Sequence, residues 1–268
     1  MLCKICQNKT KLIFTAVILK KFTADYFCCP FCEAVQTSEP KWLAEAYSDA
    51  ITKQDTGLIS RNIACGRLAL NIAKKCFNPK KRFLDYAGGY GMLVRLMRDG
   101  GLDFYLYDQY CQNLFAKDFS IEKLSSKKDR YELITAFEVF EHLVDPMNEI
   151  EEIFCRTDSI LFSTTLLPKD KEIDQKWNYL GFDHGQHIFF YSKKTLEFIA
   201  KKFHKKLYTD GKNFHLITSK KFLINPLWFY MISPTVIYRR IWNKLSTILK
   251  WKPIPRMNHY ELRPFKSK

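Results

Sequence analysis

The stretch FLDYAGGYGMLVRLM, residues 83–97, is an apolar run that ends at an acid, breaks into a glycine-rich turn and resumes as an apolar stripe at helical spacing. This order predicts a strand over 82–87 and a helix over 90–100, joined by a tight turn. Such a turn often holds a nucleotide-bearing ligand, because the first backbone N–H groups of a helix have no partner within the helix. A glycine turn alone can also be purely structural, so the surrounding sequence must decide.

Past this turn, strand and helix patterns alternate along the chain. Strands are expected over 104–108, 131–137, 159–167 and 213–219, and helices over 145–154 and 192–203, the last of them capped by Ser192. A helix that precedes the turn, over 57–77, carries its apolar residues on one face. This alternation predicts an α/β fold, a Rossmann-like parallel sheet with right-handed crossovers and helices on both faces.

The acids around the turn indicate which ligand it holds. A dinucleotide-binding turn of the form G-x-G-x-x-G would place a glycine where this chain has Val94. Asp85 would repel a phosphate, but it suits a ligand with a positive centre and no phosphate, such as S-adenosylmethionine. Asp108, at the end of the second strand, can accept hydrogen bonds from a ribose diol. The combination favours S-adenosylmethionine over a domain without a cofactor.

Four segments, FLDYAGGYG, LYDQY, ITAFEVFEHLVDP and HGQHIFFYSKKTLEFIAKKF, together resemble class I S-adenosylmethionine-dependent methyltransferases. The resemblance covers about residues 1–218, and the most similar branch carries an N-terminal four-cysteine zinc module and belongs to sugar and surface-polysaccharide pathways. It implies a seven-stranded sheet and cofactor binding by Asp85, Ala87, Gly88, Gly89, Gly91, Asp108, Asp118, Phe119, Phe137 and Glu138. Ala87 stands where the family has its first glycine, and we expect it at negative φ, which alanine tolerates.

The resemblance implies methyl transfer to a small polar acceptor, a sugar or glycan precursor. One alternative acceptor is RNA, because some rRNA methyltransferases also carry an N-terminal zinc module. Two observations argue against RNA as the acceptor. The chain before residue 219 is only mildly basic, and no Asn-Pro-Pro-Tyr type motif follows the strand expected over 131–137. A second alternative is a non-catalytic binding module that retains the cofactor fold.

Two Cys-x-x-Cys pairs near the N-terminus, Cys3 with Cys6 and Cys29 with Cys32, indicate a metal site. Four thiolates at this spacing suit tetrahedral zinc, and a module too short to build its own core gains stability from a metal. We therefore expect a zinc-ribbon-like module with a structural Zn²⁺. Cys28 is an alternative ligand to Cys29, although the Cys-Pro-Phe-Cys turn favours Cys29.

A second cluster follows the strand expected over 131–137. There, Glu138-x-x-Glu141-His142 lies at the carboxyl edge of the predicted sheet. Downstream, DHGQH supplies His187 in the loop before the helix over 192–203. The long connection over 165–186, which carries three aromatic residues, is expected to act as a substrate lid. Three interpretations stay open. The two acids and two histidines can hold one cation, as a similar set holds Mg²⁺ in small-RNA 2′-O-methyltransferases. Alternatively, His187 or His142, with Glu141 beside them, takes a proton from a substrate hydroxyl. Finally, these residues can simply border the cofactor pocket and cap a helix.

Basic charge is concentrated at the C-terminus. The chain has a formal net charge of +15, and residues 219–268 contain eleven basic residues and one acid, Glu261. The pattern over 236–250 predicts a basic amphipathic helix, and three tryptophans lie in the same tail. Such a helix suits an anionic membrane surface, and the alternative is a helix that packs on the domain or on a second subunit in a homodimer.

These patterns divide the chain into four expected units: a zinc module over 1–38, a linker and helices over 39–80, a methyltransferase domain over 81–218 and a helical basic extension over 219–268. No signal-peptide pattern and no stretch long enough to span a membrane are present. We therefore expect a cytoplasmic protein, with the extension placing it at the inner face of the membrane.

Overall fold

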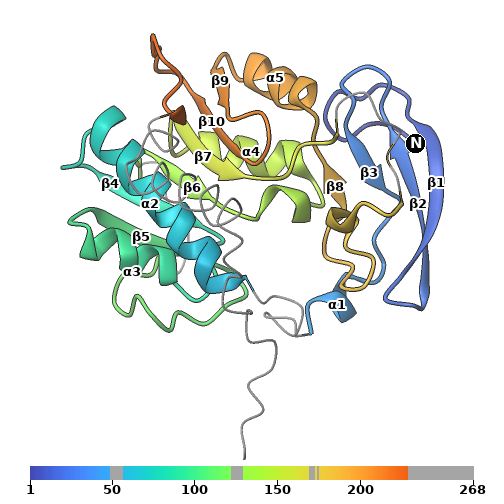
Figure 1. The fold of residues 1–268 in the computed structure, drawn as a ribbon, viewed down its shortest axis with the longest axis horizontal. Helices are drawn as coiled ribbons and strands as arrows, with labels where there is room; N and C mark the ends of the chain where they lie inside the picture. The colour runs from blue at the N-terminus through green and yellow to red at the C-terminus, as the bar shows by residue number, and fades with distance from the viewer. Residues whose placement is uncertain (49–56, 122–128, 169–172, 174, 229–268) are drawn as a thin grey trace, which may run out of the picture.

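The computed structural model describes residues 1–48, 57–121, 129–168, 173 and 175–228. They form two sheets that lie side by side, a larger one flanked by the long helices and a smaller one built from the N-terminal residues (Figure 1). The tail helix expected over 236–250 falls outside the described residues. Among the described residues, no helix is both long and apolar enough to cross a membrane.

The larger sheet has six strands in the order β5-β4-β6-β7-β10-β9. Its strands are β4 (Arg82–Tyr86), β5 (Asp103–Tyr107), β6 (Ile134–Ala136), β7 (Ser159–Ser163), β9 (Lys206–Thr209) and β10 (Phe214–Thr218). The first four are parallel, and β10 runs antiparallel to both of its neighbours. Beyond β5, Ser120 forms an isolated parallel bridge to Leu106, so the described residues contain six strands of the seven that the resemblance implies.

Helices cover both faces of this sheet, as the alternating pattern predicts. They are α2 (Leu58–Cys76), α3 (Met92–Asp99), α4 (Pro146–Phe154) and α5 (Lys193–Lys202). Neighbouring strand residues point to opposite faces. Phe83 therefore packs with residues of α2 and α3, whereas Leu84 packs with residues of α4 and α5. The Rossmann-like α/β prediction is confirmed.

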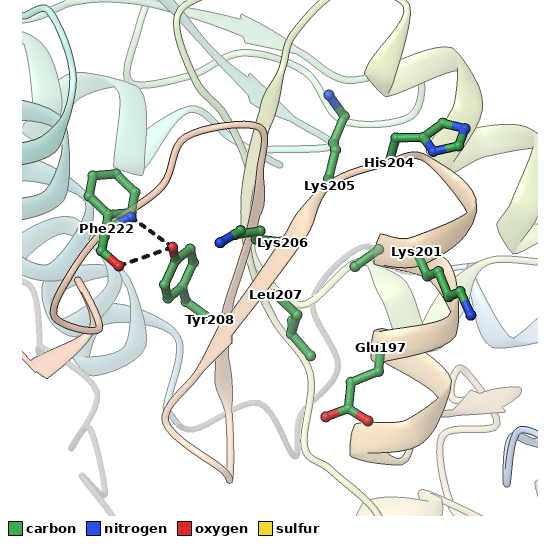
Figure 2. Close-up of a pocket in the computed structure, with 9 residues that line it drawn as sticks. Glu197, Lys201, His204, Lys205, Lys206, Leu207, Tyr208 and Phe222 are labelled. Carbon is green, nitrogen blue, oxygen red and sulfur yellow. Dashed lines mark hydrogen bonds between the residues drawn. The ribbon is translucent and has the colours of Figure 1, made fainter.

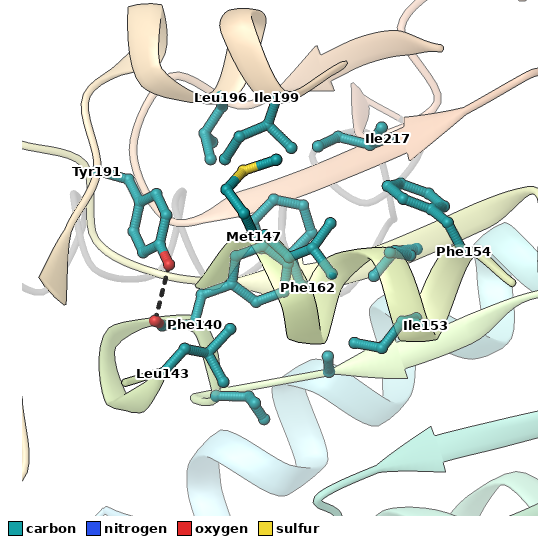
Figure 3. Packing of buried hydrophobic residues seen from close by; sticks show 14 of the residues in the cluster. Phe140, Leu143, Met147, Ile153, Phe154, Phe162, Tyr191, Leu196, Ile199 and Ile217 are labelled. Atoms are coloured by element: carbon teal, nitrogen blue, oxygen red, sulfur yellow. Dashed lines mark hydrogen bonds between the residues drawn. The ribbon is translucent and has the colours of Figure 1, made fainter. Parts of the chain in front are cut away.

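The face under α4 and α5 is filled by aromatic and aliphatic side chains (Figure 3). Phe140 stacks on Phe162 with ring centroids 3.9 Å apart, and the Tyr191 hydroxyl donates to the Phe140 carbonyl over 2.9 Å. Ser192 caps α5 as expected, through a capping box with Thr195. This packing fixes the short 3₁₀ turn at Phe140–His142, which carries part of the predicted catalytic cluster.

The smaller sheet is antiparallel, in the order β1-β2-β3-β8. It contains β1 (Lys11–Ile18), β2 (Phe22–Cys28), β3 (Val35–Thr37) and β8 (Phe189–Phe190), and the short helix α1 (Leu43–Ala46) follows it. The sequence patterns predicted neither β8 nor β9. Because β8 comes directly after His187, the N-terminal sheet holds the chain on which that histidine lies.

Candidate functional site

The turn between β4 and α3 has an unusual backbone. Ala87 has φ of +53°, Gly89 +60° and Gly91 +84°. The expectation of negative φ at Ala87 is therefore wrong. The Ala87 N–H donates to the Tyr107 carbonyl over 2.7 Å. This hydrogen bond extends the pairing between β4 and β5 by one residue beyond β4, and the chain turns away from the sheet immediately afterwards. A left-handed alanine costs about 1–2 kcal/mol relative to a glycine at the same place.

Two glycines of this turn are required by packing, and one leaves space. A Cβ on Gly88 would overlap the Asp85 carboxylate and lie 2.7 Å from Leu106 Cδ1. A Cβ on Gly91 would lie 2.7 Å from Asn113 Oδ1. A Cβ on Gly89, by contrast, would meet nothing within 4 Å. The turn is therefore packed on its inner side and open at Gly89, where a ligand can approach the backbone.

The two predicted cofactor acids have different surroundings. Asp85 is buried and accepts a 2.6 Å hydrogen bond from Thr135 Oγ1. Burial raises the pKa of Asp85 to about 7, although the bond from Thr135 acts in the opposite direction. Asp108 accepts from three backbone N–H groups, those of Gly89, Tyr110 and Cys111, each over 2.8 Å. Asp108 thus holds the turn in shape, and its Oδ2 atom, which accepts only one of these three bonds, retains a lone pair for a ligand hydroxyl.

The remaining predicted cofactor residues are spread over a wider region. Asp118 has φ of +69°, and the Phe119 ring lies under the Arg98 guanidinium, 3.5 Å from its carbon, in the last turn of α3. That turn is at the opposite end of α3 from Gly91. Phe137 packs edge-on against Phe214. The structure therefore does not bring the Phe119 ring to the glycine turn.

Glu138 links the sheet edge to α2. It has φ of +55°, its N–H donates to Ser163 Oγ over 2.8 Å, and Ser163 Oγ donates in turn to Glu138 Oε1 over 2.6 Å. The other carboxylate oxygen lies 3.8 Å from Arg61 Nε. Glu138 is thus engaged on both oxygens and lies next to the second cluster rather than in it.

The second cluster joins Glu141, His142 and His187, each of which places one potential ligand atom within 4.8 Å of the other two. Glu141 is fully buried, and Tyr179 Oη donates to its Oε1 over 2.7 Å. Burial, with a further contribution from Glu138, raises the pKa of Glu141 to about 8. Its Oε2 atom is buried without a hydrogen-bond partner among the described residues.

Burial favours the neutral form of both histidines of the cluster. Burial lowers the pKa of His142 to about 4, and burial together with His142 lowers the pKa of His187 well below its usual value. Nδ1 of His142 lies 2.9 Å from the Gln186 carbonyl, and Nδ1 of His187 lies 2.6 Å from the Tyr179 carbonyl. Because a carbonyl only accepts, we assign the proton of each ring to Nδ1, which leaves a lone pair on each Nε2.

Tyr47, which sequence reasoning missed, completes the surroundings of His142. Its hydroxyl lies 2.9 Å from His142 Nδ1. The chain around it is tied to the histidine loop, because Trp42 Nε1 donates to the Gly185 carbonyl and Gln186 Nε2 donates to the Ala46 carbonyl. No motif marks Tyr47 in the sequence, and only the fold reveals its place.

The long connection before His187 packs on the N-terminal sheet in its described part. The Trp177 ring lies 5.9 Å from Phe190, and the Phe182 ring lies 5.8 Å from Tyr26. Tyr179 belongs to the same hydrophobic cluster, yet its hydroxyl reaches Glu141. In this structure the aromatic residues of the connection therefore pack on the N-terminal sheet, and Tyr179 among them contacts the second cluster through Glu141.

The four N-terminal cysteines form a compact group. Cys3 and Cys32 have sulfurs 3.5 Å apart, Cys6 and Cys29 have sulfurs 3.4 Å apart, and all four sulfurs lie within 4.8 Å of one another. Sulfurs bound to one tetrahedral zinc are about 3.8 Å apart. The arrangement is therefore compatible with zinc, and Cys28 is not part of it.

A separate hollow of about 690 Å³ lies between α5 and β9 (Figure 2). Lys201, His204, Lys205 and Lys206 line it, and Tyr208 hydrogen-bonds to the backbone of Phe222 at one end. None of the predicted cofactor or catalytic residues borders this hollow. The chemistry-bearing residues are at the carboxyl edge of the parallel strands instead.

Comparison with known proteins identifies one domain. A family model described as "Methyltransferase domain" matches residues 60–204, which is more than half of the chain. A search of curated protein sequences found no match.

Several solved structures share the arrangement of elements at low sequence identity. The SAH-bound form of CalO1, a methyltransferase in calicheamicin biosynthesis, is 10% identical with a TM-score of 0.42, and the match covers 66% of this chain and 61% of that one. An O-methyltransferase family 2 protein from Planctomyces limnophilus is 12% identical with a TM-score of 0.43, covering 66% and 65% of the two chains. The plantazolicin methyltransferase BpumL is 11% identical with a TM-score of 0.44, covering 79% and 88%. The match therefore spans less than two thirds of the first two of these proteins.

Proposed function

Because the chain belongs to the methyltransferase domain family, we propose that it transfers a methyl group from S-adenosylmethionine to a small polar acceptor, a sugar or glycan precursor. S-adenosylmethionine supplies an electrophilic methyl group on its sulfonium sulfur. Gly89 supports this assignment, because it leaves the backbone of the glycine turn open to a ligand. Asp108 supports it as well, because its carboxylate shapes the turn and retains a lone pair on Oδ2 for a ribose hydroxyl.

The observation that carries the proposal is the cluster of Glu141, His142 and His187 beside Glu138, at the carboxyl edge of the sheet. An acceptor oxygen attacks better after it loses its proton. Nε2 of either histidine has a lone pair that can take this proton. The same residues can instead hold a cation that lowers the pKa of the acceptor hydroxyl. Either way, this cluster activates the acceptor.

The polar groups around the cluster favour a neutral, hydroxyl-rich acceptor. Tyr47 and Tyr179 offer hydroxyls, and Gln186 contributes its backbone carbonyl. Arg61 lies close to Glu138, so its positive charge is partly compensated. RNA binding depends mainly on lysine and arginine contacts to phosphates, and the described residues around the cluster do not supply a set of them.

The four-cysteine group supports a structural zinc. A bound Zn²⁺ would cross-link the two cysteine pairs. Ser192 Oγ and Thr195 Oγ1 both donate to the Cys32 carbonyl, over 3.2 and 2.8 Å. The metal would therefore also fix the start of α5 and, through β3 and β8, the chain that carries His187.

The acceptor class is tested with S-adenosylmethionine carrying a labelled methyl group, incubated with the full chain and a cell extract. Small molecules, lipid-linked material and RNA are then separated. We expect label in the soluble or lipid-linked sugar fractions, and none in a parallel incubation without the protein. Nuclease-sensitive label in RNA would overturn the sugar assignment. Cofactor binding without labelling of any fraction would favour a non-catalytic module.

A further inference from the structure

The cluster of Glu141, His142 and His187 contains a buried acceptor that the protein does not satisfy. Glu141 Oε2 has no hydrogen-bond partner among the described residues, although the side chain is fully buried. An unsatisfied buried polar atom costs about 1–3 kcal/mol, so native structures rarely contain one without a reason. One carboxylate oxygen of Glu141 lies within 4.8 Å of one nitrogen of each histidine.

The outer contacts of all three side chains match those of metal ligands. A histidine that binds a metal usually donates its other N–H to a carbonyl or carboxylate, and this fixes the ring. His142 faces the Gln186 carbonyl and His187 faces the Tyr179 carbonyl in this way. A carboxylate ligand is likewise held by a hydrogen bond to its second oxygen, and Tyr179 Oη gives this bond to Glu141 Oε1.

We infer that Glu141 Oε2 and the Nε2 atoms of His142 and His187 bind one divalent transition-metal ion. Two imidazoles with one carboxylate suit Mn²⁺, Fe²⁺ or Zn²⁺, whereas Mg²⁺ prefers oxygen ligands alone. One potential ligand atom of each residue lies within 4.8 Å of the other two, so small side-chain rotations bring the three donor atoms to the bond lengths of about 2.0–2.2 Å that such ions require.

Three protein ligands leave positions open for other oxygens. An acceptor hydroxyl in one of these positions would lose its proton more easily, because a bound cation stabilises the alkoxide. This role of the ion rests on the proposed function. Binding of the ion does not, because it depends only on the three side chains and their outer contacts.

The test uses Mn²⁺ and the full chain, with zinc retained in the cysteine group. Mn²⁺ suits nitrogen and oxygen ligands and does not compete for four thiolates. Free Mn²⁺ is measured by its electron paramagnetic resonance signal during a titration of wild type. We expect one bound ion per chain. His187→Ala and Glu141→Gln should weaken binding by at least about 100-fold, because each removes a ligand.

Two further variants separate ligand loss from unfolding. Tyr179→Phe keeps all three ligands and removes only the hydrogen bond to Glu141, so it should weaken Mn²⁺ binding by about 10–100-fold. His204→Ala removes an exposed histidine after α5 and should leave binding unchanged. Thermal melts of each variant show whether it is folded.

Absence of Mn²⁺ binding to folded wild type, or equal binding by folded His187→Ala, would overturn the inference. Methyl transfer by wild type in excess chelator, with the cysteine zinc retained, would overturn the role of the ion in the reaction and leave the proposed function intact. Mn²⁺ binding that depends on His187, in a protein that transfers no methyl group, would support the ion and contradict the proposed function.

Discussion

Replacing Asp85 with asparagine should stabilise the protein, and the stabilisation should grow with pH. Burial raises the pKa of Asp85 from 3.8 to about 7, whereas an aspartate in the unfolded chain titrates near 3.9. Below about pH 4 the group is protonated in both states and has no effect. Between about pH 4 and 7 only the unfolded state releases the proton, so the free energy of unfolding falls as pH rises.

The size of this effect follows from the two pKa values. The difference between 3.8 and about 7, at about 1.4 kcal/mol for each pH unit, gives about 4 kcal/mol above pH 7. At pH 5 the corresponding cost is about 1.5 kcal/mol. Asparagine has nearly the same shape as protonated aspartic acid and can accept the hydrogen bond from Thr135. It does not ionise, so it avoids this cost.

Urea unfolding at pH 5 and pH 8.5 measures the effect directly. The free energy of unfolding of Asp85→Asn minus that of wild type should increase by about 3 kcal/mol between the two pH values. Asp99→Asn is the matched control, because Asp99 is exposed on α3, where its carboxylate lies 3.1 Å from Arg95 Nε. It should show no comparable pH dependence. An equal difference for Asp85→Asn at both pH values would refute the burial argument.

Four further perturbations test separate parts of the structure. Gly88→Ala should lower the free energy of unfolding, followed by thermal melts, by about 1–3 kcal/mol because its Cβ would overlap the Asp85 carboxylate. Gly211→Ala is the control: a Cβ there meets nothing within 4 Å, so the substitution should cost only about 1 kcal/mol of backbone strain. Chelation of the metal in the four-cysteine group should lower both Tm and methyl transfer, with recovery on addition of Zn²⁺; unchanged values would show that the group does not support the histidine loop. Tyr47→Phe should slow methyl transfer about tenfold or more at unchanged SAH affinity, and an unchanged rate would exclude Tyr47 from acceptor activation. Deletion of residues 219–268 should abolish co-sedimentation with anionic liposomes, and equal sedimentation of both proteins would end the membrane proposal.

Local patterns in the sequence were sufficient to predict most of the strands and helices of the central domain. The apolar run into Asp85 predicted β4, the helical stripe predicted α3, and Ser192 predicted the start of α5. Each of these signals is contained within a few neighbouring residues. The sequence also suggested His142 and His187 as members of one cluster, and their ring centroids lie 5.1 Å apart.

Contacts between distant parts of the chain account for what the sequence patterns missed. The positive φ of Ala87 follows from its hydrogen bond to Tyr107 on the neighbouring strand. The two-residue strand β8 forms because it pairs with Val35 and Gln36 in the N-terminal sheet. Tyr47 reaches a histidine 95 positions away. Periodicity within a short window carries no information about such pairs.

The role of the second cluster is tested most directly by comparing methyl transfer by His187→Ala and wild type, once the labelled acceptor is purified. SAH affinity, measured by calorimetry on the same samples, shows whether the cofactor side is intact. We predict that His187→Ala binds SAH as wild type does but transfers the methyl group about 10²–10⁴-fold more slowly. Full turnover by a folded His187→Ala variant would contradict acceptor activation by this cluster.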